Sequence, residues 1–298
     1  MRDFPVSGSR GLAEQVARWE RGEIVPAEVA LASTVMLVRA SAGPRRGPGS
    51  SSLEVFLQRR VASMEFAPSM LVFPGGRVDP RDARTDVRWA GRSPQQWADV
   101  LGVHEDESRE LVTAAVRELF EECGVLLAGP DEHSVVADVS SPVWHERRMA
   151  LTRHEISLAE VLSHESLVLR GDLLAYRAHW VTPVFEPRRY DTRFFAAAVP
   201  EGQVPDARTS EADHADWADP AETVAALDRG EVMMLPPTRV QLETLAAAAS
   251  VAEVVTDADD VVRVMPELVD LPGGLVLRTP LPAAPGRVRA EHGQDDES

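Results

Sequence analysis

Lysine and asparagine are both absent from this chain of 298 residues, so that all 31 of its basic side chains are arginines. Without lysine, the chain cannot form a Schiff-base or pyridoxal-phosphate lysine or a lysine-bearing phosphate loop. Without asparagine it has no acceptor for N-glycosylation. Cysteine is nearly absent as well, because Cys123 stands alone. This excludes an internal disulfide and every multi-cysteine zinc or iron–sulfur site, and it suits a reducing compartment.

Long apolar runs are also missing. No run approaches the roughly 18 residues of a membrane span, and the first 15 residues lack the apolar core of a signal peptide. The sequence therefore predicts a cytoplasmic protein with no membrane partner.

Positive charge is in short supply, since 48 acidic residues outnumber the arginines and the formal net charge is −17. Such a balance disfavours binding to nucleic acid, which depends on many cationic contacts to phosphates. An anionic small substrate would need bound metal or clustered arginines to hold it. Composition thus favours a globular protein that uses divalent cations.

Strands and helices alternate along the chain, which permits an α/β fold. We expect a helical lead-in over residues 1–28, a main domain over 29–278 and a disordered acidic tail over 279–298. The polar stretch 77–106 reads as an insertion, with one helix that begins after Ser93. Two late apolar runs, 261–264 and 275–277, are expected to pair as a hairpin.

The clearest helix covers about residues 107–122 and stops at Gly124. At about 100° per residue, Glu118, Glu121 and Glu122 share one face of it, and Arg117 is placed to pair with Glu121 one turn on. A solvated acidic face is the simple interpretation. However, carboxylates near a helix C-terminus meet the negative end of the macrodipole, so their presence indicates function. Crowded carboxylates predict Mg²⁺ or Mn²⁺ between them.

The string R-E-L-F-E-E-C-G-V at residues 117–125 resembles the second half of the signature of Nudix hydrolases, G-x5-E-x7-R-E-U-x-E-E-x-G-U, in which U is aliphatic. F-P-G-G at 73–76 resembles its opening strand and turn. The distance from Gly76 to Arg117 is 41 positions where the plain signature has 14, so 27 extra residues lie inside. Arg109 stands eight before Arg117, which leaves the role of the first signature glutamate open.

The resemblance implies an α/β/α sandwich with a mixed central sheet, an insertion and extra helices. It also implies hydrolysis of an acid anhydride, a diphosphate, with metal on Glu118, Glu121, Glu122 and the Gly76 carbonyl. Either Glu121 or a carboxylate outside the signature would take the proton or position the water. Glu211 fits that second role because it stands six before Trp217, and Glu186 is the alternative.

The insertion, together with W-V-T-P (180–183), R-Y-D-T-R-F-F (189–195) and L-P-P-T (235–238), is similar to the subgroup that contains peroxisomal-type acyl-coenzyme A diphosphatases. A coenzyme A pattern laid back from Phe73 places an arginine on Arg60, but its second arginine falls on Glu65 and its glycine on Ser69. The expected substrate is coenzyme A or an acyl ester of it. The alternatives are an ADP-ribose or NADH diphosphatase and a catalytically weak nucleotide-binding regulatory module.

Three residues are expected to bind this nucleotide-type small molecule: Arg60, Phe73 and Arg193. Arg193 alternates with core positions beside Asp191, so internal pairing is an equal alternative for it. A homodimer is left open. Because both halves of the signature must meet, we expect Gly76 beside the start of the acidic helix and residues 77–106 looping outward as a lid or an interface.

Overall fold

The structure is a computed structural model, and it describes most of the chain. The described residues are 1–5, 14, 16–19, 21–41, 51–63, 67–207, 209 and 212–282.

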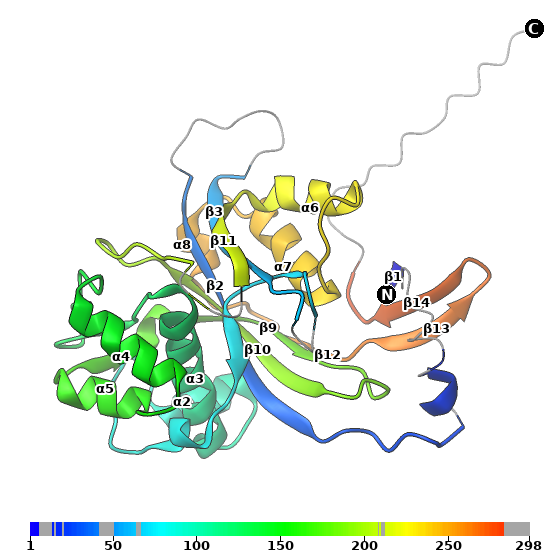
Figure 1. Ribbon diagram of the computed structural model, residues 1–298. Helices are drawn as coiled ribbons and strands as arrows, with labels where there is room; N and C mark the ends of the chain where they lie inside the picture. The colour runs from blue at the N-terminus through cyan, green and yellow to red at the C-terminus, as the bar shows by residue number, and fades with distance from the viewer. Residues whose placement is uncertain are drawn as a thin grey trace, which may run out of the picture.

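A mixed sheet forms the centre of the molecule (Figure 1). Its strands lie in the order β11 (Ala212–Ala218), β3 (Leu53–Arg60), β2 (Val29–Ala40), β10 (Arg189–Ala198), β9 (Ala175–Val181) and β12 (Arg263–Val264). Two short strands extend it, since β4 (Leu71–Val72) pairs with β3 and β5 (Gly75–Arg77) pairs with β2. Strand β10 runs parallel to β2 and β12 parallel to β9, whereas the other pairs are antiparallel.

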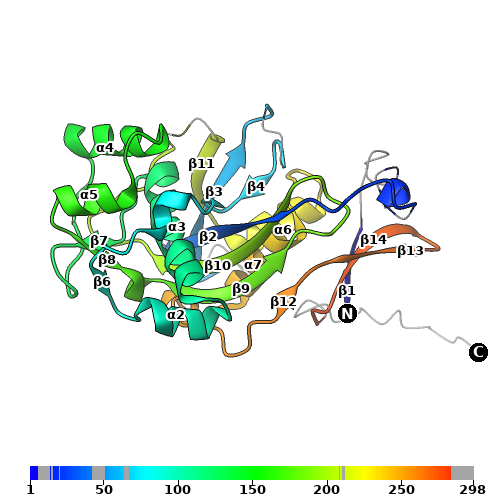
Figure 2. The same ribbon diagram turned by 90° about the horizontal axis from the view of Figure 1, so that it is seen from below.

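Helices cover both faces of this sheet (Figures 1 and 2). Along β2, Val35 and Leu37 pack on one side with helix α3 (Glu105–Cys123), while Met36 and Val38 pack on the other side with α7 (Pro236–Ala247). This alternation is the period of two of an extended strand, with both faces buried. Further α-helices with described bounds are α2 (Pro94–Leu101), α4 (Pro142–Thr152), α5 (Leu158–His164), α6 (Pro220–Asp228) and α8 (Val251–Val254). The expected α/β/α sandwich with a mixed sheet is confirmed.

The segment 77–106 does not loop outward, so the expectation of an outward loop that serves as a lid is wrong. Helix α2 begins at its Ser93 cap, as predicted, and its Trp97 is fully buried, with its ring in edge contact with Phe195 of β10. Strand β6 (Trp89–Ala90) joins β8 (Val168–Arg170), which also pairs with β7 (Ala128–Gly129), in a small second sheet. Apolar side chains in this segment therefore make it part of the core.

The two ends of the described chain meet in a third sheet. Strand β1 (Arg2–Pro5) pairs with β14 (Gly274–Thr279), which also pairs with β13 (Glu267–Leu271). The lead-in 1–28 thus begins with a strand, with helical residues at 14 and 16–19. The expected pairing of 261–264 with 275–277 is wrong, because a tight Pro-Gly turn at 272–273 joins β14 to the nearer β13 instead.

The predicted tail begins within this sheet. Thr279 is fully buried at the end of β14, and residues 283–298 lie outside the described residues. Every helix in the described ranges is too short or too polar to cross a membrane.

Candidate active site

The acidic helix α3 ends, as expected, at Gly124, whose φ of +69° is the left-handed conformation that glycine adopts most easily. Its carboxylates do not form a solvated face. Glu118 and Glu122 are only 9% and 5% exposed, and the side chain of Glu121 is 10% exposed. Burial raises the pKa of the Glu121 carboxyl above its ordinary value. Because buried carboxylates are costly unless paired, these three need partners.

Strand β5 lies against this helix and supplies one of those partners. The backbone N–H of Gly75 donates to Glu122 Oε2 over 2.9 Å. A Cβ atom on Gly76 would come within 2.4 Å of Glu118 Oε1, so the backbone of Gly76 touches that carboxylate. Gly76 therefore lies beside the acidic helix, as predicted, but against Glu118 in its second half and not at its start.

Arg117 ties the carboxylates together. Its Nη1 donates to Glu118 Oε1 at 2.8 Å and to Glu121 Oε2 at 3.3 Å, and its Nη2 donates to the backbone oxygen of Arg77 at 2.8 Å. The predicted pairing of Arg117 with Glu121 is therefore present. Burial would lower the pKa of Arg117, but the surrounding carboxylates outweigh this and raise it above its ordinary value. The guanidinium thus stays charged and holds the acidic group in place.

Asp82 is the partner that the sequence analysis missed. It is 1% exposed and accepts from Arg117 Nε at 3.0 Å and from Nη2 at 3.0 Å, a two-point pair. Counting eight positions back from Arg117 led to Arg109, which instead pairs with Glu105 near the start of α3. Counting six forward from Gly76 would have led to Asp82, the position of the first signature glutamate. The extra residues therefore follow Asp82 rather than Gly76.

Removing the carboxylate of Asp82 should destabilise the protein strongly. Asp82→Ala breaks a buried ion pair and leaves the Nε–H of Arg117 without its acceptor, and we expect the free energy of unfolding to fall by about 3–5 kcal/mol. Urea unfolding followed by circular dichroism measures this.

Asp86→Ala is the matched control, because Asp86 lies in the same segment and pairs with Arg84 on the surface, where both side chains are well exposed. Exposed pairs contribute at most about 1 kcal/mol. Equal losses in the two variants would contradict the buried role of Asp82.

Arg148, also missed, stabilises the acidic end of α3 from the other side. It is 4% exposed, its Nε donates to the backbone oxygen of Glu121 at 2.9 Å, and its Nη1 donates to Asp206 Oδ1 at 2.8 Å. A cation at a helix C-terminus offsets the negative end of the macrodipole. This explains how three glutamates are tolerated there, and no local sequence pattern links α4 to that carbonyl.

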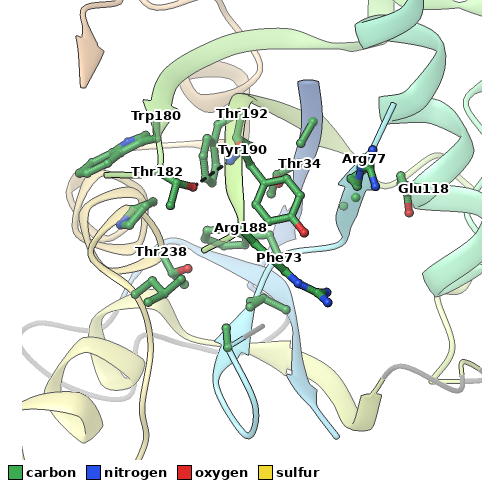
Figure 3. A pocket seen from close by; sticks show the side chains of 18 of the residues that line it. Thr34, Phe73, Arg77, Glu118, Trp180, Thr182, Arg188, Tyr190, Thr192 and Thr238 are labelled. Carbon is green, nitrogen blue, oxygen red and sulfur yellow. Dashed lines mark hydrogen bonds between the residues drawn. The ribbon is translucent and has the colours of Figure 1, made fainter. Parts of the chain in front are cut away.

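A pocket of about 890 Å³ opens from this acidic end (Figure 3). Arg77 and Glu118 lie at one end, and the rest is lined by aromatic side chains, Trp180 and Tyr190 among them, together with prolines, threonines and charged residues. Arg60 and Phe73, predicted to bind substrate, both line this pocket. It therefore combines a carboxylate end with a remainder of apolar and polar side chains, as a site for a charged group attached to a larger organic group requires.

Arg193 does not line the pocket. Thr192 and Phe194 do, and successive side chains of a strand point to opposite faces, so Arg193 points to the other side of the sheet. There its Nη1 contacts Asp191 and lies 2.6 Å from His179 Nε2. The internal pairing considered for Arg193 is the one observed. Arg193 is therefore not part of the substrate pocket.

The carboxylate expected outside the helix has two candidates. Glu211 lies outside the described residues. Glu186 lines the pocket, and burial raises the pKa of its carboxyl. Asp79 lines it as well, but its pKa is lowered by the Arg81 guanidinium that binds it. Among the described residues, Glu186 therefore remains the candidate for accepting a proton there.

The donors at the acidic end suit a hard divalent cation. Glu121 Oε1 is buried and has no hydrogen-bond partner, an orphaned oxygen that a cation would satisfy. Carboxylate and carbonyl oxygens are the ligands that Mg²⁺ and Mn²⁺ prefer. In the part of the chain described, no three acidic, histidine or cysteine side chains converge as a ready metal centre. Arg117 occupies one oxygen each of Glu118 and Glu121, whereas the unpartnered Glu121 Oε1 is the observation that fits a cation at this place.

Comparison with known proteins agrees with this geometry. Residues 107–245 match a family model described as the NUDT19 Nudix domain. A Nudix hydrolase structure from Alicyclobacillus acidocaldarius superposes with a TM-score of 0.63 at 26% identity, over 77% of this chain and 96% of that one. Residues 107–245 are thus similar in sequence to a Nudix domain, and the fold of the chain is that of Nudix hydrolases.

Some curated proteins that are similar to this chain have names that also state an activity. It is 30% identical over 200 residues to "Putative nudix hydrolase 7" of Caenorhabditis elegans, a match over 64% of this chain and 55% of that protein. It is 24% identical to "Acyl-coenzyme A diphosphatase NUDT19" of Xenopus laevis, over 70% of this chain and 64% of the relative. The human protein of the same name is 25% identical, over 82% of this chain and 73% of the relative. The chain thus spans somewhat more than half the length of the first two relatives.

Proposed function

We propose that this protein hydrolyses a diphosphate linkage in a nucleoside diphosphate-linked substrate, with Mg²⁺ or Mn²⁺, and that its substrate is coenzyme A or an acyl ester of it. The observation that carries the proposal is that Glu118 and Glu121 line the pocket, while Glu118 and Glu122 lie against the Gly75–Gly76 strand. Bound there, a divalent cation would neutralise the diphosphate and lower the pKa of a water molecule.

The residues of the chain have distinct parts in this proposal. Arg117, held by Asp82, orients the carboxylates of Glu118 and Glu121. Glu121 or a carboxylate outside the helix, Glu211 or Glu186, takes a proton from the attacking water. The water oxygen bonds to one phosphorus, and the bond from that phosphorus to the bridging oxygen breaks. The bridging oxygen keeps the electron pair, and two phosphate-bearing products leave.

Coenzyme A is favoured by two features. The two relatives named acyl-coenzyme A diphosphatase align over most of this chain. Arg60 lines the pocket with a buried Nε that has no hydrogen-bond partner, and with no lysine in the chain an arginine must hold the 3′-phosphate of coenzyme A. A cytoplasmic location and a homodimer stay predictions from the sequence.

A product screen by mass spectrometry tests the substrate class. The panel is coenzyme A, acyl-coenzyme A esters, ADP-ribose, NADH and dinucleoside polyphosphates, each with Mg²⁺ and with Mn²⁺. We expect the highest kcat/KM for a coenzyme A compound. Faster hydrolysis of ADP-ribose or NADH would replace the proposed substrate by that alternative, and no hydrolysis of any compound would favour a regulatory module.

Arg60→Ala should raise KM for coenzyme A about 10- to 100-fold, because a charge-assisted hydrogen bond to the 3′-phosphate is lost. Its KM for dephospho-coenzyme A, which lacks that phosphate, should change little. Arg59→Ala is the control, since Arg59 is the neighbouring residue and pairs with Asp213 on the surface. Equal effects of Arg60→Ala on both substrates would contradict this role.

A further inference from the structure

Almost every described arginine has a partner. Their guanidinium groups contact carboxylates, backbone oxygens or other groups. Within the described ranges the exceptions are Arg60 and Arg77, for which the structure shows no side-chain hydrogen bond or ion pair. Both line the same pocket. In a chain with a net charge of −17, two unpaired cations on one pocket indicate a place for an anion.

The backbone of Arg77 is held firmly at the acidic end. Arg77 follows Gly76 in β5, pairs with Ala32 of β2, and its oxygen accepts from Arg117 Nη2 at 2.8 Å. Its side chain is exposed, and Figure 3 shows it beside Glu118. The backbone of Arg77, from which this side chain extends, is thus held in place relative to the carboxylates of α3.

The nearby carboxylates leave Arg77 unpaired because they bind Arg117 instead. Asp82, Glu118 and Glu121 all accept from that guanidinium. A guanidinium remains protonated at any physiological pH, and its planar donors match the oxygens of a phosphate. Arg77 is therefore an unpaired guanidinium in the pocket that Glu118 and Glu121 also line.

We propose that Arg77 is a substrate-binding residue that donates to non-bridging oxygens of the scissile diphosphate. This assignment rests on the diphosphatase activity proposed above and adds a contact to it. Arg77 lies on β5, whereas the carboxylates lie on α3. The contact of Arg77 with the diphosphate is therefore separate from those of the proposed metal ligands. Arg60 then binds a different anionic group of the same substrate, the 3′-phosphate proposed above.

Binding of methylenediphosphonate, a diphosphate analogue that is not hydrolysed, tests the assignment without catalysis. Calorimetry with Mg²⁺ should show affinity falling about 10- to 100-fold in Arg77→Ala, the loss of a charge-assisted hydrogen bond, with partial recovery in Arg77→Lys. The melting temperature should not change, because the side chain is exposed. Arg84→Ala, which removes an arginine paired with Asp86 on the surface, should bind like the wild type.

Kinetics with the best substrate complete the test. We expect kcat/KM of Arg77→Ala to fall by a similar factor for substrates with and without a 3′-phosphate, unlike the selective effect of Arg60→Ala. Unchanged affinity for the analogue in Arg77→Ala, or no binding by the wild type, would overturn the assignment. Binding that depends on Arg77 in a protein that hydrolyses no diphosphate would support the assignment and refute the proposed function instead.

Discussion

Glu122→Gln is expected to lower kcat about a thousandfold or more while the protein remains folded. The substitution removes the charge of a carboxylate that we assign to the metal. An amide oxygen still accepts the hydrogen bond from the Gly75 N–H, so the contact between α3 and β5 survives. Steady-state kinetics at saturating Mg²⁺ measures the loss. A Mg²⁺ or Mn²⁺ titration of the melting temperature gives a second readout, since a metal that binds the folded state stabilises it.

Asp106→Asn is the matched control for this variant. Asp106 is an exposed carboxylate in the first turn of the same helix, away from the pocket. Its loss should cost about 0.3–1 kcal/mol of stability through the helix dipole and leave kcat unchanged. Near-normal turnover in Glu122→Gln would show that this glutamate is not a metal ligand. If millimolar Mg²⁺ or Mn²⁺ leaves the melting temperature of the wild-type protein unchanged, that result would count against the whole metal assignment.

Gly76→Ala should reduce kcat/KM about 100-fold or more. The added methyl group would lie 2.4 Å from Glu118 Oε1, 2.7 Å from its Cδ and 2.9 Å from its Oε2. The carboxylate cannot swing away freely, because Arg117 holds it at 2.8 Å. Either Glu118 or β5 must shift, and displacement of a catalytic group by about 1 Å costs about 100-fold in rate.

Gly273→Ala provides the comparison, since a Cβ atom in that turn between β13 and β14 meets nothing within 4 Å. We expect wild-type kinetics and a nearly unchanged melting temperature for it. If Gly76→Ala also kept normal kcat/KM, the close approach of Gly76 and Glu118 would have no catalytic role.

Local features of the site could be predicted because neighbours in the sequence determine them. The face shared by Glu118, Glu121 and Glu122 follows from the helical period, and the pairing of Arg117 with Glu121 follows from a spacing of four. Likewise the Ser93 cap and the Gly124 stop depend only on the adjacent turn. Each of these predictions was confirmed.

Only the tertiary structure decided which distant residues meet. Asp82 bonds to Arg117, which stands 35 positions later in the sequence. Trp97 packs on Phe195, and this contact makes the segment that was expected to loop outward part of the core. Arg193 lies on the face of β10 that contacts His179, not on the face that lines the pocket. The order of the strands and the packing of helices on them determine such contacts. A sequence pattern alone therefore located the acidic helix, while the fold selected its partners and left Arg60 and Arg77 unpaired in the pocket.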